Sequence, residues 1–329
     1  MPSTISSNDS SMPPRYPIRA GPKLTGADAG GPPLSPLMRR VREGIRAPGS
    51  RIAGDTYDWA CVSIDRQSPP AIELVEVVKH FGSERALDGL SLEVPTGAIT
   101  VLLGPSGAGK TVTINHIVGL IHPSAGTVKV EGKDLAAISD AELNELRRGM
   151  GVALQGNQPF TCGLFFSLNV YENVAFALRG RRTRWPPERI DEVTMEYLQM
   201  VGLRDNANDM PEQLSSGMRK RTALARALAL EARIVIIDDF DSGIDGVRLA
   251  LLCEVIQDVQ SHTGATVLVT THDMTAARKL ADYAAVIHEG RIVASGGADA
   301  VFASHEPIAQ QLISGELSGP IKLRSTQDG

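Results

Sequence analysis

The apolar and polar positions change their pattern along the chain. Ile72–Val78 and Leu90–Val94 alternate between apolar and polar residues, as strands with one buried and one exposed face do. Ile234–Ile237 and Thr266–Thr270 are apolar or weakly polar throughout, which is typical of parallel strands that helices cover on both sides. The pattern therefore predicts half-exposed antiparallel strands first and a central parallel sheet later in the chain.

Other segments complete the predicted elements. A helical spacing of apolar residues predicts helices over Val112–Val118, Pro187–Leu203 and Asp209–Leu230. Thr127–Gly132 predicts an edge strand, and Ala284–His288 with Arg291–Ala294 predicts a hairpin that turns at Glu289–Gly290. No internal repeat is visible, so the chain is expected to contain a single copy of its domain.

The first seventy residues have a different character. Met1–Pro36 is rich in Ser, Pro and Gly and poor in large apolar residues, so it has little surface to bury against the entropy of ordering. We expect residues 1–70 to form a disordered extension. The alternative is a short basic amphipathic helix on a membrane surface, because Leu37, Val41 and Ile45 recur at helical spacing beside four arginines.

Composition narrows the classes of protein. The net charge of -5 gives no reason to expect a nucleic acid partner. The three cysteines are far apart in the sequence, which predicts free thiols in a reducing compartment. The sequence has no run of about 18 apolar residues and no signal peptide. A cytoplasmic protein is therefore expected.

The strongest chemical signal is a glycine loop between a predicted strand and a predicted helix. Ile99–Leu103 precedes the loop, which reads Gly-Pro-Ser-Gly-Ala-Gly-Lys-Thr, and this context is that of a phosphate-binding P-loop. Lys110 is expected to reach the β- and γ-phosphates of a nucleotide, and the Thr111 hydroxyl to bind Mg²⁺. The predicted nucleotide-binding residues are Gly104, Pro105, Ser106, Gly107, Ala108, Gly109, Lys110, Thr111 and Val112.

Further motifs follow in a fixed order, and together they resemble the ATP-binding cassette (ABC) ATPases over residues 71–303. Ile234–Asp238 looks like a Walker B strand, and Asp238 is expected to anchor Mg²⁺. The helix start Leu214, Ser215, Ser216, Gly217 and Met218 looks like the signature motif. In this family the signature closes over the γ-phosphate that the P-loop of a second subunit holds.

The resemblance also assigns roles to single residues. Asp239 stands at the position of the catalytic carboxylate, and His272 at that of the histidine that senses the γ-phosphate. Gln155 matches the glutamine that contacts Mg²⁺ and the attacking water. Phe81 lies where family members stack a ring on adenine. Ser242 and Asp245 lie in the segment that resembles the D-loop of the subunit interface.

A narrower resemblance is to the ATPases of Mce (mammalian cell entry)-type lipid transporters, in particular the actinobacterial form. The segments that carry it are Ser167–Phe176, Gly217–Arg221, Asp241–Gly243 with Val247–Arg248, and the end of the chain around Glu306–Gly315. The resemblance implies an α/β P-loop fold with a mixed central sheet, an antiparallel β subdomain and a helical signature subdomain. It also implies ATP and Mg²⁺ as cofactors, a homodimer or heterodimer of ATPase subunits beneath membrane permeases, and a peripheral position on the inner face of the membrane.

Several positions depart from the family pattern. Asp239 replaces the usual glutamate and is shorter by one methylene, so its carboxylate is expected to fall short of the usual position. Misplacement of a reacting group by ~1 Å can lower a rate by about 10²-fold. Ser216 replaces a signature glycine, Phe240 a proline, and Gly246 the proline of the D-loop. The loop after Gln155 is longer than the pattern and includes Pro159–Cys162. It lies where such ATPases meet the permease.

These departures leave alternatives to an energising subunit of a lipid or sterol transporter. One is a slow or non-hydrolysing regulatory ATP-binding subunit that pairs with a competent paralogue. Another is the ATPase of an importer for a different solute. A soluble ABC protein of ribosomes or DNA is disfavoured by the single uninterrupted cassette. We expect the ATPase domain to span residues 71–303 and a tail to span 304–329.

Overall fold

The computed structural model describes residues 69–154, 163–181 and 185–321. The predicted disordered extension therefore lies outside the described residues except for Pro69 and Pro70, and so do Gln155 and the segment Pro159–Cys162. Cys253 is a free buried thiol, and burial raises its pKa to about 11.

Six strands form the larger sheet, in the spatial order β10 (Arg291–Gly297), β9 (Tyr283–His288), β3 (Ile99–Leu103), β8 (Thr266–Thr271), β7 (Ile234–Ile237) and β6 (Met150–Ala153). The pairs β9–β3, β3–β8, β8–β7 and β7–β6 are parallel, and β10 pairs antiparallel with β9. The predicted parallel centre and the predicted hairpin are confirmed. The carboxyl ends of the parallel strands meet at one edge of the sheet, which is where ligands bind in such folds.

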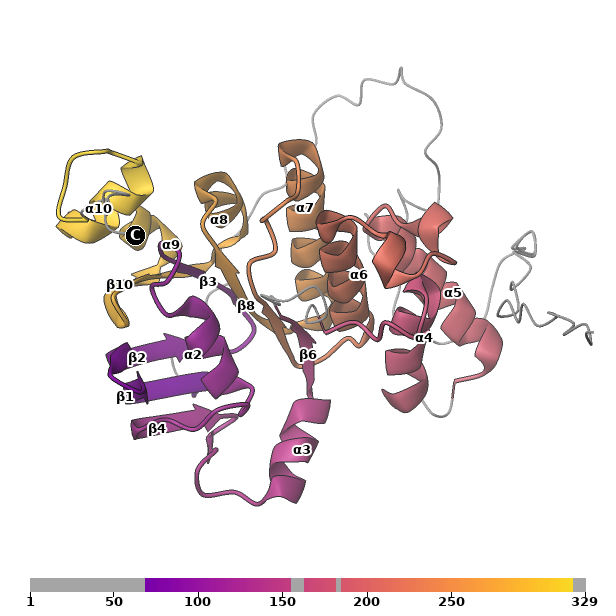
Figure 1. The fold of residues 1–329 in the computed structure, drawn as a ribbon, viewed down its shortest axis with the longest axis horizontal. Helices are drawn as coiled ribbons and strands as arrows, with labels where there is room; N and C mark the ends of the chain where they lie inside the picture. The colour runs from indigo at the N-terminus through magenta and orange to yellow at the C-terminus, as the bar shows by residue number, and fades with distance from the viewer. Residues whose placement is uncertain (1–68, 155–162, 182–184, 322–329) are drawn as a thin grey trace, which may run out of the picture. The chain divides into compact units, whose positions relative to one another are not determined.

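Four antiparallel strands form a second sheet in the order β2 (Glu84–Val94), β1 (Ile72–Phe81), β4 (Ala125–Val130) and β5 (Lys133–Asp134) (Figure 1). The predicted alternating strands are confirmed, but both are longer than predicted. The strand predicted at Thr127–Gly132 is confirmed as β4, but its edge position is wrong, because β4 pairs with β1 on one side and with the two-residue β5 on the other. Gly132 lies in the turn between β4 and β5.

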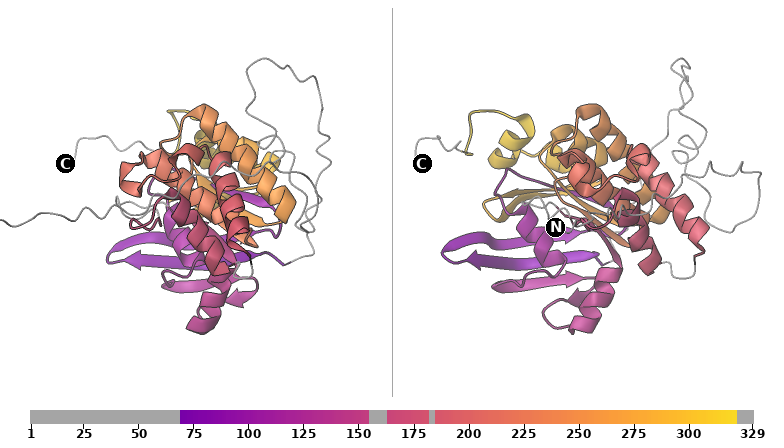
Figure 2. Two further views of the ribbon diagram at one scale, coloured as in Figure 1. Left: turned by 90° about the vertical axis from the view of Figure 1, so that its right-hand side faces the viewer. Right: turned by 45° about the vertical axis from the view of Figure 1, so that its right-hand side comes forward.

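The α-helices of the described residues are α2 (Lys110–Ile117), α3 (Asp140–Arg148), α4 (Val170–Arg181), α5 (Pro187–Met200), α6 (Ser216–Ala229), α7 (Gly246–Thr263), α8 (Met274–Leu280), α9 (Ala298–Phe302) and α10 (Pro307–Ser314). Of these, α4, α5 and α6 pack against one another and form a helical subdomain (Figure 2). The prediction of one helix over Asp209–Leu230 is wrong at its start. A 3₁₀ turn spans Pro211–Gln213, and α6 begins at Ser216 because the Ser215 side chain caps it.

The core lies on both faces of the six-stranded sheet. In β3, Val101 and Leu103 join a cluster that includes residues of α4 to α8, whereas Leu102 joins a cluster that includes β1, β2 and α2. Neighbouring side chains of a strand point to opposite faces, so a strand that is covered on both faces is apolar or weakly polar throughout, as β3 is with Thr100 as its one polar residue. This explains the continuous apolar runs in the sequence.

The stretch predicted as a tail contains α10. Ala309 of α10 is fully buried in the larger core cluster, and the Gln311 amide exchanges hydrogen bonds with the backbone of Ile321. Within the described residues, no helix is both long enough and apolar enough to cross a membrane.

Candidate functional site

The P-loop forms the turn between β3 and α2, as predicted. Gly109 precedes α2 with a φ of 109°, a value that side-chain-bearing residues rarely adopt. A Cβ at this position would lie 2.9 Å from Leu87 Cδ2 and 3.0 Å from the Ala86 carbonyl. No side chain caps the start of α2, so its first N–H groups can donate to an anion.

Lys110 folds back over the loop. Its Nζ donates hydrogen bonds to the Gly104 carbonyl at 2.7 Å and to the Pro105 carbonyl at 2.9 Å. Burial lowers the pKa of Lys110, and the nearby carboxylates of Asp239, Asp238 and Asp241 partly oppose this shift. The ammonium therefore lies between the P-loop and the three aspartates that follow β7.

Asp238 joins the P-loop to the parallel sheet. It is 4% exposed, and its Oδ2 accepts a hydrogen bond from Thr111 Oγ1 at 2.9 Å. Its Oδ1 accepts one from Thr270 Oγ1 at 2.6 Å. Hydroxyl and carboxylate oxygens are the ligands that Mg²⁺ prefers, so Thr111 and Asp238 fit the predicted metal site. Thr270 orients the carboxylate from β8.

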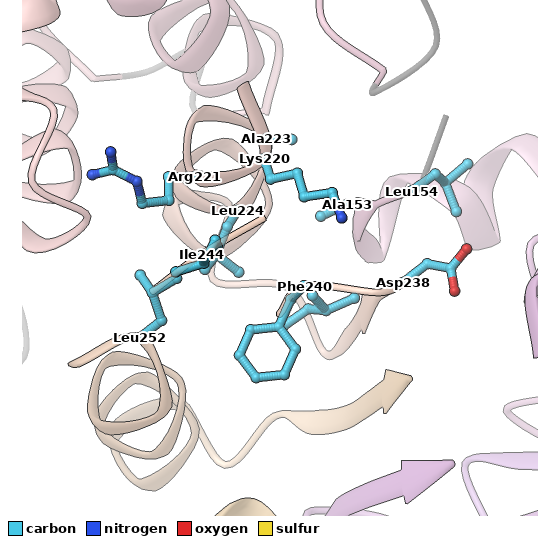
Figure 3. Close-up of a pocket in the computed structure, with 11 residues that line it drawn as sticks. Ala153, Leu154, Lys220, Arg221, Ala223, Leu224, Asp238, Phe240, Ile244 and Leu252 are labelled. Carbon is cyan, nitrogen blue, oxygen red and sulfur yellow. The ribbon is translucent and has the colours of Figure 1, made fainter. Parts of the chain in front are cut away.

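Asp239 has an unusual backbone and several partners. Its φ is 51°, and its N–H donates to Thr270 Oγ1 at 2.8 Å. Lys220 of α6 donates to the Asp239 carbonyl at 2.8 Å and to Oδ2 at 3.0 Å. Lys220 and Asp238 line a small pocket together with Phe240 (Figure 3). Thr270 thus holds the backbone of Asp239 from the sheet side, and Lys220 holds the predicted catalytic carboxylate from the helical side.

His272 follows β8 at the same edge of the sheet. Its side chain is 59% exposed, and Nδ1 lies 3.1 Å from Asp241 Oδ2 and 3.5 Å from Asp239 Oδ1. These three residues present possible metal ligands within 4.8 Å of one another. The structure therefore brings the predicted histidine next to the predicted catalytic carboxylate.

The signature segment lies at the start of α6. Ser215 Oγ accepts a hydrogen bond from the Met218 N–H at 3.2 Å, and both Ser215 and Ser216 are exposed. Gly217 packs so closely that a Cβ would lie 2.7 Å from the Gly243 carbonyl. Within the described part of the chain, no hydrogen bond or ion pair connects Ser215 or Ser216 to the P-loop.

The D-loop segment leads into α7. Asp245 caps this helix by accepting the Arg248 N–H at 3.0 Å, and this hydrogen bond lowers the pKa of the exposed Asp245 carboxyl. Ser242 is half-buried, and Gly246 is the first residue of α7. The family pattern has proline at the position of Gly246, and proline is favoured at the first helical position. The replacement of this proline by Gly246 therefore leaves the helix start intact.

Phe81 ends β1 with its side chain 49% exposed. The Lys79 ammonium lies 5.3 Å from the centre of its ring, a distance suited to a cation–π contact. An exposed ring can stack on a base, and the contact of Phe81 with adenine stays a prediction. Gln155, the remaining predicted site residue, lies outside the described residues.

The sequence reasoning missed two residues of the site and left a third without a role. Thr270 was placed in a predicted strand and Lys220 in a predicted helix, and neither was given a role in the site. Asp241 was used only as part of a segment that resembles one branch of the family. The one signal for Thr270 is a polar residue at the end of a buried strand. Lys220 has no local signal, because its role depends on where α6 lies relative to β7.

Known proteins resemble this chain over most of its length. The family model for ABC transporters matches residues 87–242. A probable ribonucleotide transport ATP-binding protein, mkl of Mycobacterium leprae, is 38% identical over 258 residues, which are 78% of this chain and 73% of that protein. The intermembrane phospholipid transport system ATP-binding protein MlaF of Escherichia coli K12 is 36% identical over 253 residues, which are 77% of this chain and 92% of MlaF.

Solved structures agree with the fold. The dimeric structure of MJ0796, a bacterial ABC transporter cassette, has a TM-score of 0.63 and 29% identity and covers 69% of this chain and 98% of its own. A post-hydrolysis state of the same cassette, bound to ADP and phosphate, has a TM-score of 0.62 and 28% identity over the same shares. The predicted fold class is confirmed.

Proposed function

Because the chain belongs to the ABC transporter family and is the ATP-binding and ATP-hydrolysing subunit of a transporter, we propose that it energises the transport of lipid or sterol through an Mce-type system in the cell envelope. ATPases of this family act as dimers with membrane permeases. The chain would then be a peripheral subunit on the inner face of the membrane.

The proposal assigns ATP and Mg²⁺ to the edge of the parallel sheet. The N–H groups at the start of α2 and the Lys110 ammonium would hold the phosphates, and Phe81 would stack on adenine. Thr111, Asp238 and Gln155 would hold Mg²⁺, which neutralises phosphate charge when it is bound. Asp239 would orient the attacking water, and His272 would contact the γ-phosphate.

The starts of α2 and α6, which could each bind an anion, are separate in this chain. This supports a composite site, in which one nucleotide contacts residues of two subunits. The start of α2 lies in the P-loop, whereas Ser215 at the start of α6 is exposed and, as far as the described residues extend, makes no hydrogen bond to the P-loop. Ser215 and its neighbours would therefore act on the nucleotide of a second subunit, and Ser242 and Asp245 would lie at the interface between the two.

The likeness to MlaF is the observation that carries the lipid assignment, because MlaF belongs to a phospholipid transport system and this chain covers 92% of it. The name of the mycobacterial relative favours a second candidate, the transport of ribonucleotides. A third candidate is a slow regulatory subunit, which the replacement of glutamate by Asp239 favours.

Co-purification distinguishes the two transport candidates. We expect the tagged chain, isolated from membranes in detergent, to bring down integral permease subunits and to enrich phospholipid or sterol above the composition of the bulk membrane. The same lipid should stimulate ATP hydrolysis by the reconstituted complex. Mass spectrometry and an ATPase assay measure these effects. Stimulation by ribonucleotides other than the ATP substrate, with no effect of lipid, would contradict the lipid assignment and support the second candidate.

We expect an Asp239→Glu variant to hydrolyse ATP faster than the parent protein. The longer side chain moves the carboxylate toward the attacking water, and the expected gain is about tenfold or more, since ~1 Å of misplacement can account for about 10²-fold. Steady-state phosphate release measures the rate, and Asp239→Asn is the matched control for loss of the carboxylate. An unchanged or lower rate for Asp239→Glu would refute the idea that the side-chain length limits turnover.

A further inference from the structure

The carboxylate of Asp241 is buried without a hydrogen bond. Its side chain is 2% exposed, and neither Oδ1 nor Oδ2 accepts a hydrogen bond from the described residues. A buried carboxylate without donors is strongly destabilising, and natural chains rarely keep one without a functional reason. The side chain therefore needs an explanation that the fold alone does not provide.

Asp241 does not support the loop in the way that neighbouring aspartates do. Asp245 accepts the Arg248 N–H, and Asp273 accepts the Ala276 N–H at 2.7 Å, so each caps a helix. Among the described residues, no backbone N–H donates to the Asp241 carboxylate. Its own carbonyl accepts the Ile244 N–H at 3.1 Å, which holds the backbone of the loop while leaving the carboxylate unused.

The polar group that faces Asp241 belongs to His272. The Nδ1 atom lies 3.1 Å from Asp241 Oδ2, which is within hydrogen-bond distance. In the isolated chain the N–H does not point at the oxygen, so no hydrogen bond forms there. Asp239 is the other nearby carboxylate, but it lies farther away at 3.5 Å and already forms an ion pair with Lys220. Asp241 is therefore the carboxylate best placed to accept the Nδ1 proton.

The sheet explains why these two residues meet. Asp241 follows β7 and His272 follows β8, and these strands are parallel neighbours whose register pairs Ile237 with Val269. The loops after the two strands therefore leave the same edge of the sheet. At this edge the Asp241 side chain is buried, whereas the imidazole of His272 is more than half exposed.

We propose that Asp241 is a positioning residue for His272: its carboxylate accepts the Nδ1–H, fixes the tautomer and the ring orientation, and thereby points Nε2 toward the γ-phosphate. The two nitrogens lie on opposite sides of the ring, so a hydrogen bond at one determines the direction and protonation of the other. This inference rests on the proposed role of His272 in ATP hydrolysis.

A double-mutant cycle tests the inference through activity. We expect Asp241→Leu, which has a similar size and no acceptor, to lower kcat by about 10- to 100-fold, the usual effect of losing a partner that orients a functional histidine. KM should stay within about twofold, and Asp241→Asn should recover part of the rate because its amide oxygen can still accept the Nδ1–H. In the His272→Ala background, Asp241→Leu should have no further effect.

Two outcomes of the cycle would overturn the inference. The first is an equal loss of rate from Asp241→Leu with and without His272, which would mean that Asp241 acts on the loop and not through the histidine. The second is a normal kcat for Asp241→Leu. Asp205→Leu, which removes an exposed carboxylate from the 3₁₀ turn Arg204–Asn206, is the matched control and should leave the rate unchanged.

A spectroscopic measurement tests the pair without reference to activity. We expect the ¹⁵N chemical shifts of His272, assigned by their loss in His272→Ala, to show a protonated Nδ1 in the parent and an altered tautomer in Asp241→Leu. The samples contain chelator, because Asp239, Asp241 and His272 could together hold a metal ion. A His272 spectrum that does not change in Asp241→Leu would contradict the inference. Full activity of His272→Ala would instead contradict the proposed function, while the spectrum still reports on the pair.

Discussion

Replacing Lys110 with alanine is expected to abolish the binding of Mg·ATP at nucleotide concentrations that saturate the parent protein. In the isolated chain the ammonium donates to the Gly104 and Pro105 carbonyls, and on binding it would exchange these for phosphate oxygens. Hydrogen bonds between charged groups are worth about 1.5–3 kcal/mol each. Two of them account for about 3 kcal/mol or more, which corresponds to about 100-fold or more in affinity.

Isothermal titration calorimetry measures the loss, and Lys133→Ala is the matched control. Lys133 lies in the short strand β5 with its side chain exposed, so its removal should leave the affinity unchanged. Thermal unfolding of the nucleotide-free proteins shows whether each variant is folded. Tight binding of ATP by folded Lys110→Ala would refute the assignment of the phosphate site.

Ser215→Asp is expected to lower ATP hydrolysis by about 100-fold or more while leaving nucleotide binding intact. Aspartate caps helices as well as serine does, so the start of α6 should keep the hydrogen bond that Ser215 Oγ accepts from Met218. The added carboxylate would face the γ-phosphate of the second subunit. Two like charges ~4 Å apart repel by about 4 kcal/mol near a protein surface, which opposes closure of the site.

The matched control is Ser215→Asn, which also caps the helix but adds no charge. We expect this variant to keep most of the parent rate, so the difference between the two variants measures the charge and not the cap. The rate is followed by phosphate release and the binding by calorimetry. Normal hydrolysis by Ser215→Asp would show that this helix start does not meet a phosphate during turnover.

The sequence predicted those elements whose pattern is local. The parallel strands were visible because burial on both faces requires apolar residues at each position, as in Ile234–Ile237. The start of α6 was placed too early, because the residues before Ser215 include a 3₁₀ turn with a helical apolar spacing. Helix α7 was not predicted, although Leu249, Leu252, Cys253 and Ile256 are buried at helical spacing along it.

The candidate site shows the same limit. The P-loop, Asp238 and His272 could be predicted because each lies beside a strand or helix in a recognisable order. The environment of Asp239 could not, because Lys220 reaches it from α6 and Thr270 from β8. Likewise, the burial of Asp241 next to His272 depends on the neighbouring positions of β7 and β8 in the sheet.

The central proposal is that two copies of this chain complete each ATPase site, with the P-loop from one copy and Ser215 from the other. The most direct test co-expresses Lys110→Ala with Ser215→Asp under two different tags and isolates the mixed pairs by both tags. In a mixed pair, one site carries both changes and the other carries none. The account predicts ATP hydrolysis at about half the rate of doubly tagged parent pairs. Mixed pairs as inactive as Lys110→Ala pairs would contradict it.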